Sequence, residues 1–125
     1  MHQAIINNQT HPLSQPILVG VCDTFFLRLL GFMFHSPISI DQGLIINQNN
    51  ESKIDSAIHM FFVNFDLAII WIDQLNKVVD TCLARRWHPF YMPNKRAKLI
   101  LEIHPDHLDQ FGIGDQLSIE NVKMD

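Results

Sequence analysis

One stretch of the sequence gathers residue types that bind anions and flat ring systems. Residues 81–101 read TCLARRWHPFYMPNKRAKLIL and hold five of the nine lysines and arginines, with no acidic residue and with aromatic side chains in between. A guanidinium group beside exposed rings can hold an anion, stack on a base or anchor a protein interface. We therefore predict a ligand-binding site on a loop at 85–96, made by Arg85, Arg86, Trp87 and His88.

The same composition also suits a loop without a binding role. Most runs of charge only keep a surface hydrated, and the rings could fold back onto the domain. Two prolines and weak periodicity argue against a regular element at 85–96. The sequence favours a non-enzymatic binding or accessory domain. Through this loop the domain would contact a partner of unknown identity, either a protein or a small anionic ligand.

An enzyme with a polar barrel pocket around His59 and Arg28 is the alternative function. The imidazole of His59 titrates near neutral pH and could act as a general base, although a hydrogen-bonded core histidine fits the same position. Arg28 suits the carbonyl-rich end of a short helix, or it could bond a carboxylate such as Glu102 or Asp73. This alternative needs His59, Arg28 and Glu102 to converge on one point.

The seven histidines do not predict a metal site. His104 and His107 are the only close pair, and a zinc ion needs three or four ligands. His88 would be a further ligand only if the 85–96 loop folds over that pair. We predict neither a bound metal nor a cofactor.

The composition limits the classes of partner. The chain has 125 residues, 47% hydrophobic and 18% charged, with a net charge of −4, which argues against disorder and against generic nucleic-acid binding. No apolar run is long enough to span a membrane, and no signal peptide is evident at the N-terminus, so we expect a cytoplasmic protein. Cys22 and Cys82 are expected to be free, with a disulfide between them as the alternative. A homo-oligomer, in which apolar outer strands are buried between subunits, is a further alternative.

Short apolar runs separated by turn residues predict a mainly β fold. The polar residues 1–16 are expected to form a flexible arm, and 17–125 a single domain. A short helix is expected at 24–30 after Asp23, and a second begins at Pro105. The runs between 57 and 84 are apolar on both faces, as in strands covered on both sides, and their short separations predict adjacent antiparallel strands. The expected strands are 17–22, 43–47, 57–63, 67–72, 78–84, 97–103 and 115–122.

These elements predict an antiparallel β barrel or sandwich of about seven strands and two short helices. The order of motifs resembles the domain of unknown function 192 family over about residues 17–122. The resemblance is carried by RLLGFMF (28–34), GLII (43–46), IHMFF (58–62), IIWID (69–73), AKLILEI (97–103) and GIGD (112–115). It implies a compact β barrel or sandwich and no established activity.

The chain also departs from the family pattern. Phe32 and His35 replace a leucine and an arginine around the Met-Phe pair, and Asp66 and Ala68 stand where members have a proline and an aspartate. A common site that used the missing aspartate would be lost or altered here. GIGD lacks the residues of a phosphate loop, so we interpret it as a turn in which Asp115 bonds backbone N–H groups.

Overall fold

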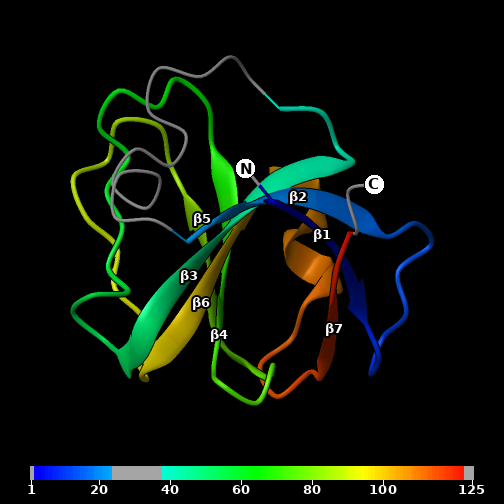
Figure 1. Ribbon diagram of the computed structural model, residues 1–125. Helices are drawn as coiled ribbons and strands as arrows, with labels where there is room; N and C mark the ends of the chain where they lie inside the picture. Colours follow the sequence, from blue (N-terminus) through cyan, green and yellow to red (C-terminus); the bar gives the residue numbers. More distant parts are fainter. Residues whose placement is uncertain (1, 24–37, 123–125) are drawn as a thin grey trace.

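Seven strands form one strongly curled sheet in this computed structural model, which describes residues 2–23 and 38–122 (Figure 1). Along the sheet the strand order is β5-β4-β6-β3-β2-β1-β7. A six-residue 3-10 helix, η1, lies between β6 and β7 in the chain. The elements are β1 (His2–Asn8), β2 (Ile17–Cys22), β3 (Gln42–Ser52), β4 (Leu67–Ile72), β5 (Val78–Ala84), β6 (Ala97–Ile103), η1 (Pro105–Gln110) and β7 (Leu117–Asn121).

The two ends of the strand order approach each other and half-close a barrel. Lys77, beside β5, forms an isolated antiparallel bridge with Gln116, beside β7. The Val78 N–H donates to the Asp115 carbonyl at 2.9 Å, and the Leu117 N–H donates to the Asn76 carbonyl at 2.8 Å. The predicted mainly β single-domain fold is therefore confirmed, as a curled half-barrel.

The expectation of a purely antiparallel sheet needs one correction. All paired neighbours are antiparallel except β2 and β3, which run parallel. A parallel pair cannot be joined by a tight turn and needs a long crossover connection, here residues 23–41. The helix predicted at 24–30 falls in this connection and lies outside the described residues.

Both faces of the central strands are buried. All six residues of β4 are buried, so the prediction of strands covered on both sides is confirmed for β4, whereas five of the seven residues of β5 are only partly buried. Inside the curl, Ile70 and Ile72 join an apolar cluster with residues of β1, β2, β6 and β7. On the outer face, Ile69 and Trp71 belong to a second cluster that includes Ile58, Met60 and Val63. An irregular layer of chain therefore covers the outside of the sheet.

The predicted flexible arm at 1–16 is wrong for residues 2–8, which form β1. This strand pairs with β2 on one side and β7 on the other. Ala4, Ile6 and Asn8 are buried, whereas Ile5, between the first two, is 38% exposed. Glutamine and asparagine residues obscure the alternation of apolar and polar residues along β1. The polar composition of this segment therefore did not indicate a strand with one buried face.

The strand expected at 57–63 is also wrong. This segment makes only one isolated bridge, between Ile58 and Tyr91, and belongs to the outer layer. Phe61 and Phe62 are 44% and 43% exposed, and Phe62 has a φ of 62°, which no regular strand contains. The hairpin expected between 57–63 and 67–72 is therefore absent, whereas the β4–β5 hairpin is confirmed.

The remaining elements follow the sequence closely. The strands expected at 17–22, 67–72, 78–84 and 97–103 are β2, β4, β5 and β6. β3 extends five residues beyond the expected 43–47, and β7 is shorter than the expected 115–122. The helix expected from Pro105 is η1, and His104 caps it, because its Nδ1 accepts the Asp106 N–H at 3.1 Å.

Candidate functional site

The predicted binding loop lies in the outer layer, where it pairs with the 57–66 segment. Ile58 and Tyr91 exchange backbone hydrogen bonds of 2.8 and 2.9 Å. The Met60 N–H donates to the His88 carbonyl at 2.9 Å, and the Trp87 N–H donates to the Met60 carbonyl at 3.0 Å. These bonds fix two irregular segments against each other although neither forms a strand.

Five large apolar side chains are exposed on these two segments. Together with Arg85 and Arg86 they form an area that we call the basic-aromatic surface. Trp87 is 47% exposed and Phe90 is 60% exposed. Tyr91 behaves differently, because its ring is half-buried and its hydroxyl accepts the Arg85 N–H at 2.9 Å. The expectation that the rings fold back therefore holds for Tyr91 but not for the exposed set: Phe61, Phe62, Trp87, Phe90 and Met92.

Trp87 and Phe62 are held in place by an unusual backbone conformation. Their φ angles are 61° and 62°, in the left-handed region that bulky residues avoid at a cost of about 1–2 kcal/mol each. Their rings meet edge to face with centroids 5.1 Å apart, and the indole Nε1–H donates to Asn64 Oδ1 at 2.7 Å. Strained positions of this kind cluster at functional sites.

The two arginines beside these rings differ in their partners. Asp66 Oδ1 accepts both the backbone N–H of Arg86, at 2.9 Å, and its Nε–H, at 3.4 Å. Asp66 therefore partly neutralises Arg86. The side chain of Arg85 is exposed and forms no ion pair among the described residues. His88 is exposed as well, with its ring 5.5 Å from that of Tyr91.

The residues of the predicted enzyme pocket are not gathered in the described part of the chain. His59 is exposed, and its Nδ1 accepts the Phe61 N–H at 3.3 Å, so it is not the core histidine considered from sequence. Glu102 is buried in β6, between Leu44 of β3 and Ile69 of β4, and burial raises its pKa to about 7. Arg28 lies outside the described residues.

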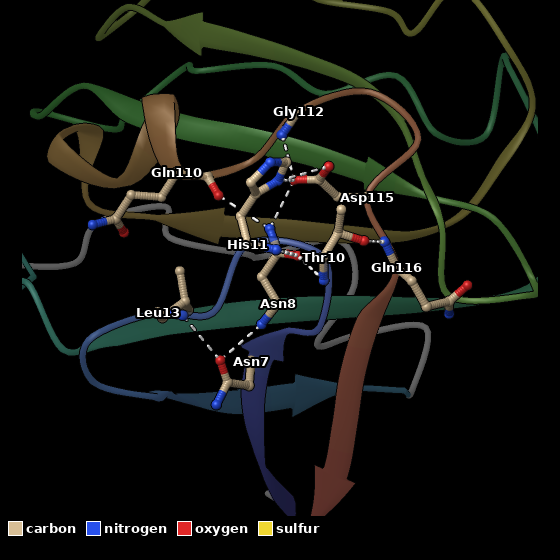
Figure 2. A network of polar contacts seen from close by, with 9 residues as sticks. All are labelled: Asn7, Asn8, Thr10, His11, Leu13, Gln110, Gly112, Asp115 and Gln116. Atoms are coloured by element: carbon tan, nitrogen blue, oxygen red, sulfur yellow. Dashed lines mark hydrogen bonds and ion pairs between the residues drawn. The ribbon is translucent and has the colours of Figure 1, made fainter.

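A polar network that sequence reasoning missed surrounds Asp115 at the end of β1 (Figure 2). The Asp115 side chain is only 6% exposed. Its Oδ2 accepts hydrogen bonds from Asn8 Nδ2 at 2.8 Å and from the Gly112 N–H at 2.9 Å, and the Nδ1 of His11 lies 3.1 Å away. Burial raises the pKa of this carboxyl, but the hydrogen bonds and the nearby His11 outweigh it and hold the pKa below its ordinary value.

The network fastens the end of β1 to the turn before β7. The predicted bond from Asp115 to a backbone N–H is confirmed, but Asn8 and His11 lie more than a hundred residues earlier in the chain, so no local pattern could reveal them. His11 is 71% exposed and borders a groove of about 390 Å³ with Ser14 and Gln110. A carboxylate on Nδ1 would orient this imidazole as a base, but no described side chain hydrogen-bonds its Nε2.

A second hollow, of about 340 Å³, lies beside the basic-aromatic surface. It is bordered by Arg86 and Asp66, by Asn64, and by His104 at the start of η1. Polar groups from three segments thus meet at one place, in a volume within the usual range of small-ligand pockets. Of these residues, the sequence predicted only Arg86 as a ligand-binding residue.

His104 and His107 are used separately. Nδ1 of His104 caps η1, whereas His107 contacts Gln110 Oε1 at 2.6 Å and the carbonyl of Ile40. In residues 2–23 and 38–122, no group of three histidine, cysteine, aspartate or glutamate side chains is placed to hold a metal ion. Within the same ranges no helix is long and apolar enough to cross a membrane.

The two cysteines do not form a disulfide. Burial raises the pKa of the Cys22 thiol to about 11, with a further contribution from the Glu102 and Asp23 charges. Burial and the Asp80 charge raise the pKa of Cys82 to about 12. Thiols with such high pKa values are weak nucleophiles at neutral pH. The expectation of two free cysteines is confirmed.

The half-closed barrel and its irregular outer layer define a small mainly β domain with a polar hollow and an exposed cationic surface. The chain belongs to the domain of unknown function 192 (DUF192) family, described as "Uncharacterized ACR", whose model matches residues 5–119. The expected family is therefore confirmed. No activity is established for this family.

Archaeal proteins of the UPF0127 group are among its relatives. The protein of Thermococcus gammatolerans is 37% identical over 84 residues, which are 67% of this chain and 53% of that protein. The protein of Thermococcus sibiricus is 35% identical over 82% of this chain and 66% of its own length. The protein of Pyrococcus horikoshii is 33% identical over 78% of this chain and 82% of its own length. The match thus spans about half to two thirds of the two Thermococcus proteins.

Two crystal structures share the fold. A Sinorhizobium meliloti protein described as a "putative transcription regulator" superposes with a TM-score of 0.81 at 12% identity, covering 94% of this chain and 92% of that one. A protein of unknown function from Novosphingobium aromaticivorans gives a TM-score of 0.75 at 15% identity, covering 93% and 83%. At these identities the likeness concerns the fold alone.

Proposed function

We propose that this protein is a non-enzymatic binding domain that docks an acidic segment of a protein partner onto its basic-aromatic surface. The observation that carries the proposal is the presentation of Trp87 and Phe62, two rings exposed to solvent although their backbone conformation is costly. Exposed aromatic and arginine side chains are the residue types that dominate binding energy at protein interfaces.

Charge favours an acidic partner. The chain is acidic overall, with a net charge of −4, yet the basic-aromatic surface carries two arginines, of which Arg86 is paired with Asp66 and Arg85 forms no ion pair among the described residues. Like charges oppose association and unlike charges accelerate it, so this face would select an acidic segment with apolar side chains for the rings. The cytoplasm is the location we propose, since the free thiols of Cys22 and Cys82 suit a reducing compartment.

The test uses fluorescent twelve-residue peptides that alternate glutamate with phenylalanine or leucine. Their matched controls replace glutamate with lysine, or the apolar residues with serine. Binding is followed by fluorescence anisotropy at two salt concentrations. We expect the acidic-apolar peptides to bind, both control sets to bind at least tenfold more weakly, and affinity to fall with salt.

Charge-reversed variants locate the contact. Arg85→Glu with Arg86→Glu should weaken binding by at least tenfold. Lys53→Glu with Lys77→Glu changes the net charge equally at two exposed lysines elsewhere on the chain and should weaken it less than threefold. The proposal is wrong if no acidic-apolar peptide binds, or if both double variants lose affinity equally. Light scattering of the unliganded protein gives the oligomeric state, and burial of this surface between two copies would also overturn the proposal.

A further inference from the structure

The hollow between Asn64, Arg86 and His104 brings together three hydrogen-bond donors from different parts of the chain. Asn64 comes from the segment that covers the sheet, Arg86 from the 85–96 loop, and His104 from the start of η1. The side chains of Arg86 and His104 are 64% and 31% exposed, so solvent reaches both side chains. Each of these three side chains has part of its hydrogen-bonding capacity already used within the protein.

The hydrogen-bond acceptor atoms of Asn64 and His104 already have donors within the protein. Asn64 Oδ1 accepts the Trp87 indole N–H at 2.7 Å, so the amide nitrogen of Asn64 is left to donate. His104 Nδ1 accepts the Asp106 N–H at 3.1 Å, which places the proton of the neutral imidazole on Nε2. Both residues are thereby oriented as donors and not as acceptors.

Arg86 supplies the charge. Its Nε and backbone N–H bond one oxygen of Asp66, while its two terminal nitrogens form no hydrogen bond to a described group. A guanidinium offers two parallel N–H groups to a planar carboxylate, and such paired hydrogen bonds are stronger than neutral ones. Asp66 opposes an incoming anion, so binding of a free carboxylate should be weak and should increase when that charge is removed.

We propose that this hollow is a carboxylate-binding site, with the terminal nitrogens of Arg86, the amide of Asn64 and the Nε2–H of His104 as donors. The carboxylate is either a glutamate or aspartate side chain of the acidic segment, in which case the inference rests on the proposed function, or a free small carboxylate. Planar geometry distinguishes the site from a general cationic patch, since lysines could not provide the paired donors.

The first test titrates the ¹⁵N-labelled protein with sodium acetate, with acetamide and sodium chloride as controls. The ring nitrogens of His104 and the guanidinium nitrogens of Arg86 are monitored by NMR. We expect saturable shifts at both residues with a dissociation constant in the millimolar range for acetate, and none for acetamide or chloride. Linear shifts, or equal shifts with chloride, would overturn the site.

Variants then separate the carboxylate site from the wider surface. Arg86→Gln and Asn64→Ala should each weaken acetate binding at least fivefold, and Arg96→Gln, a matched change in the same loop, should leave it unchanged. Asp66→Asn keeps an oxygen for the Arg86 N–H but removes the negative charge, so acetate should bind several-fold more tightly. This gain cannot arise from unfolding. Weaker or unaltered acetate binding in Asp66→Asn would contradict the proposal.

The peptide and acetate experiments fail in different ways. Saturable acetate binding without any peptide binding would leave the carboxylate site standing and remove the docking function. Peptide binding that is lost in the double arginine variant but unchanged in Asn64→Ala, with no saturable acetate effect, would remove the carboxylate site and leave the docking surface.

Discussion

Replacing Asp115 with asparagine should reveal how much the network in Figure 2 stabilises the fold. The substitution keeps the size of the side chain but removes its charge and one acceptor oxygen. Hydrogen bonds to a charged group contribute about 1.5–3 kcal/mol each, against about 1 kcal/mol for neutral ones. Two strong bonds, from Asn8 at 2.8 Å and Gly112 at 2.9 Å, would become neutral, and the His11 contact would weaken. We expect the free energy of unfolding to fall by about 2–3 kcal/mol.

The pH dependence of this loss follows from the lowered pKa of Asp115. A carboxyl whose pKa is lower in the folded state stabilises the protein at every pH above its ordinary value, 3.8, and this contribution disappears as the pH falls through the folded pKa. The difference between the wild-type protein and Asp115→Asn should therefore be constant from pH 5 upward and shrink below about pH 4.

Urea denaturation followed by far-ultraviolet circular dichroism, between pH 3 and pH 7, measures both quantities. Asp109→Asn is the matched control, because Asp109 borders the same groove but is exposed and is not among the hydrogen-bond partners of Asp115. It should change the free energy of unfolding by less than about 0.5 kcal/mol. Equal stability of Asp115→Asn and wild type at pH 7, or a loss that persists undiminished at low pH, would refute the reasoning.

Three further substitutions test the packing of the sheet. Glu102→Gln should leave the free energy of unfolding unchanged near pH 4.5 and raise it by about 3 kcal/mol above pH 7. The reason is that the wild-type protein loses stability as the pH rises from the ordinary pKa of 4.5 through the raised pKa of about 7. Urea titrations at both pH values measure this, and the opposite sign would indicate a cationic partner of Glu102. Gly43→Ala should lower the melting temperature and cost about 2–3 kcal/mol, because a Cβ there would lie 2.6 Å from the Glu102 carbonyl oxygen. Trp71→Phe removes the 2.7 Å hydrogen bond to the Ser56 carbonyl, and faster amide hydrogen exchange around Ser56, with a loss of about 2–3 kcal/mol, should follow.

Burial explains which strands the sequence predicted. β4 and β6 were recognisable because their apolar runs are short, β-branched and bounded by polar residues. Residues 57–63 have the same apolar character, but there it reflects packing of Ile58 and Met60 onto the sheet from an irregular segment. Periodicity cannot separate an apolar run within a sheet from one that lies on top of it.

The candidate site shows the same limit. The composition of 81–101 was enough to indicate Arg85, Arg86 and Trp87 as a group, because they are close in sequence. The pairing of Arg86 with Asp66, and the approach of His104, depend on how distant segments meet. The role of Asp115 was only half visible for the same reason, since its turn is local whereas Asn8 is not.

The position of β1 between β2 and β7 has a consequence for how the molecule folds. The first strand of the chain needs the last one as its neighbour, so the sheet cannot be completed on the ribosome before residues 117–121 have emerged. Pairing between such distant segments requires closure of a long loop, and topologies of this kind fold slowly, in milliseconds to seconds. During that interval the edge of β1 that later pairs with β7 is open, and it can pair with β1 of a neighbouring nascent molecule.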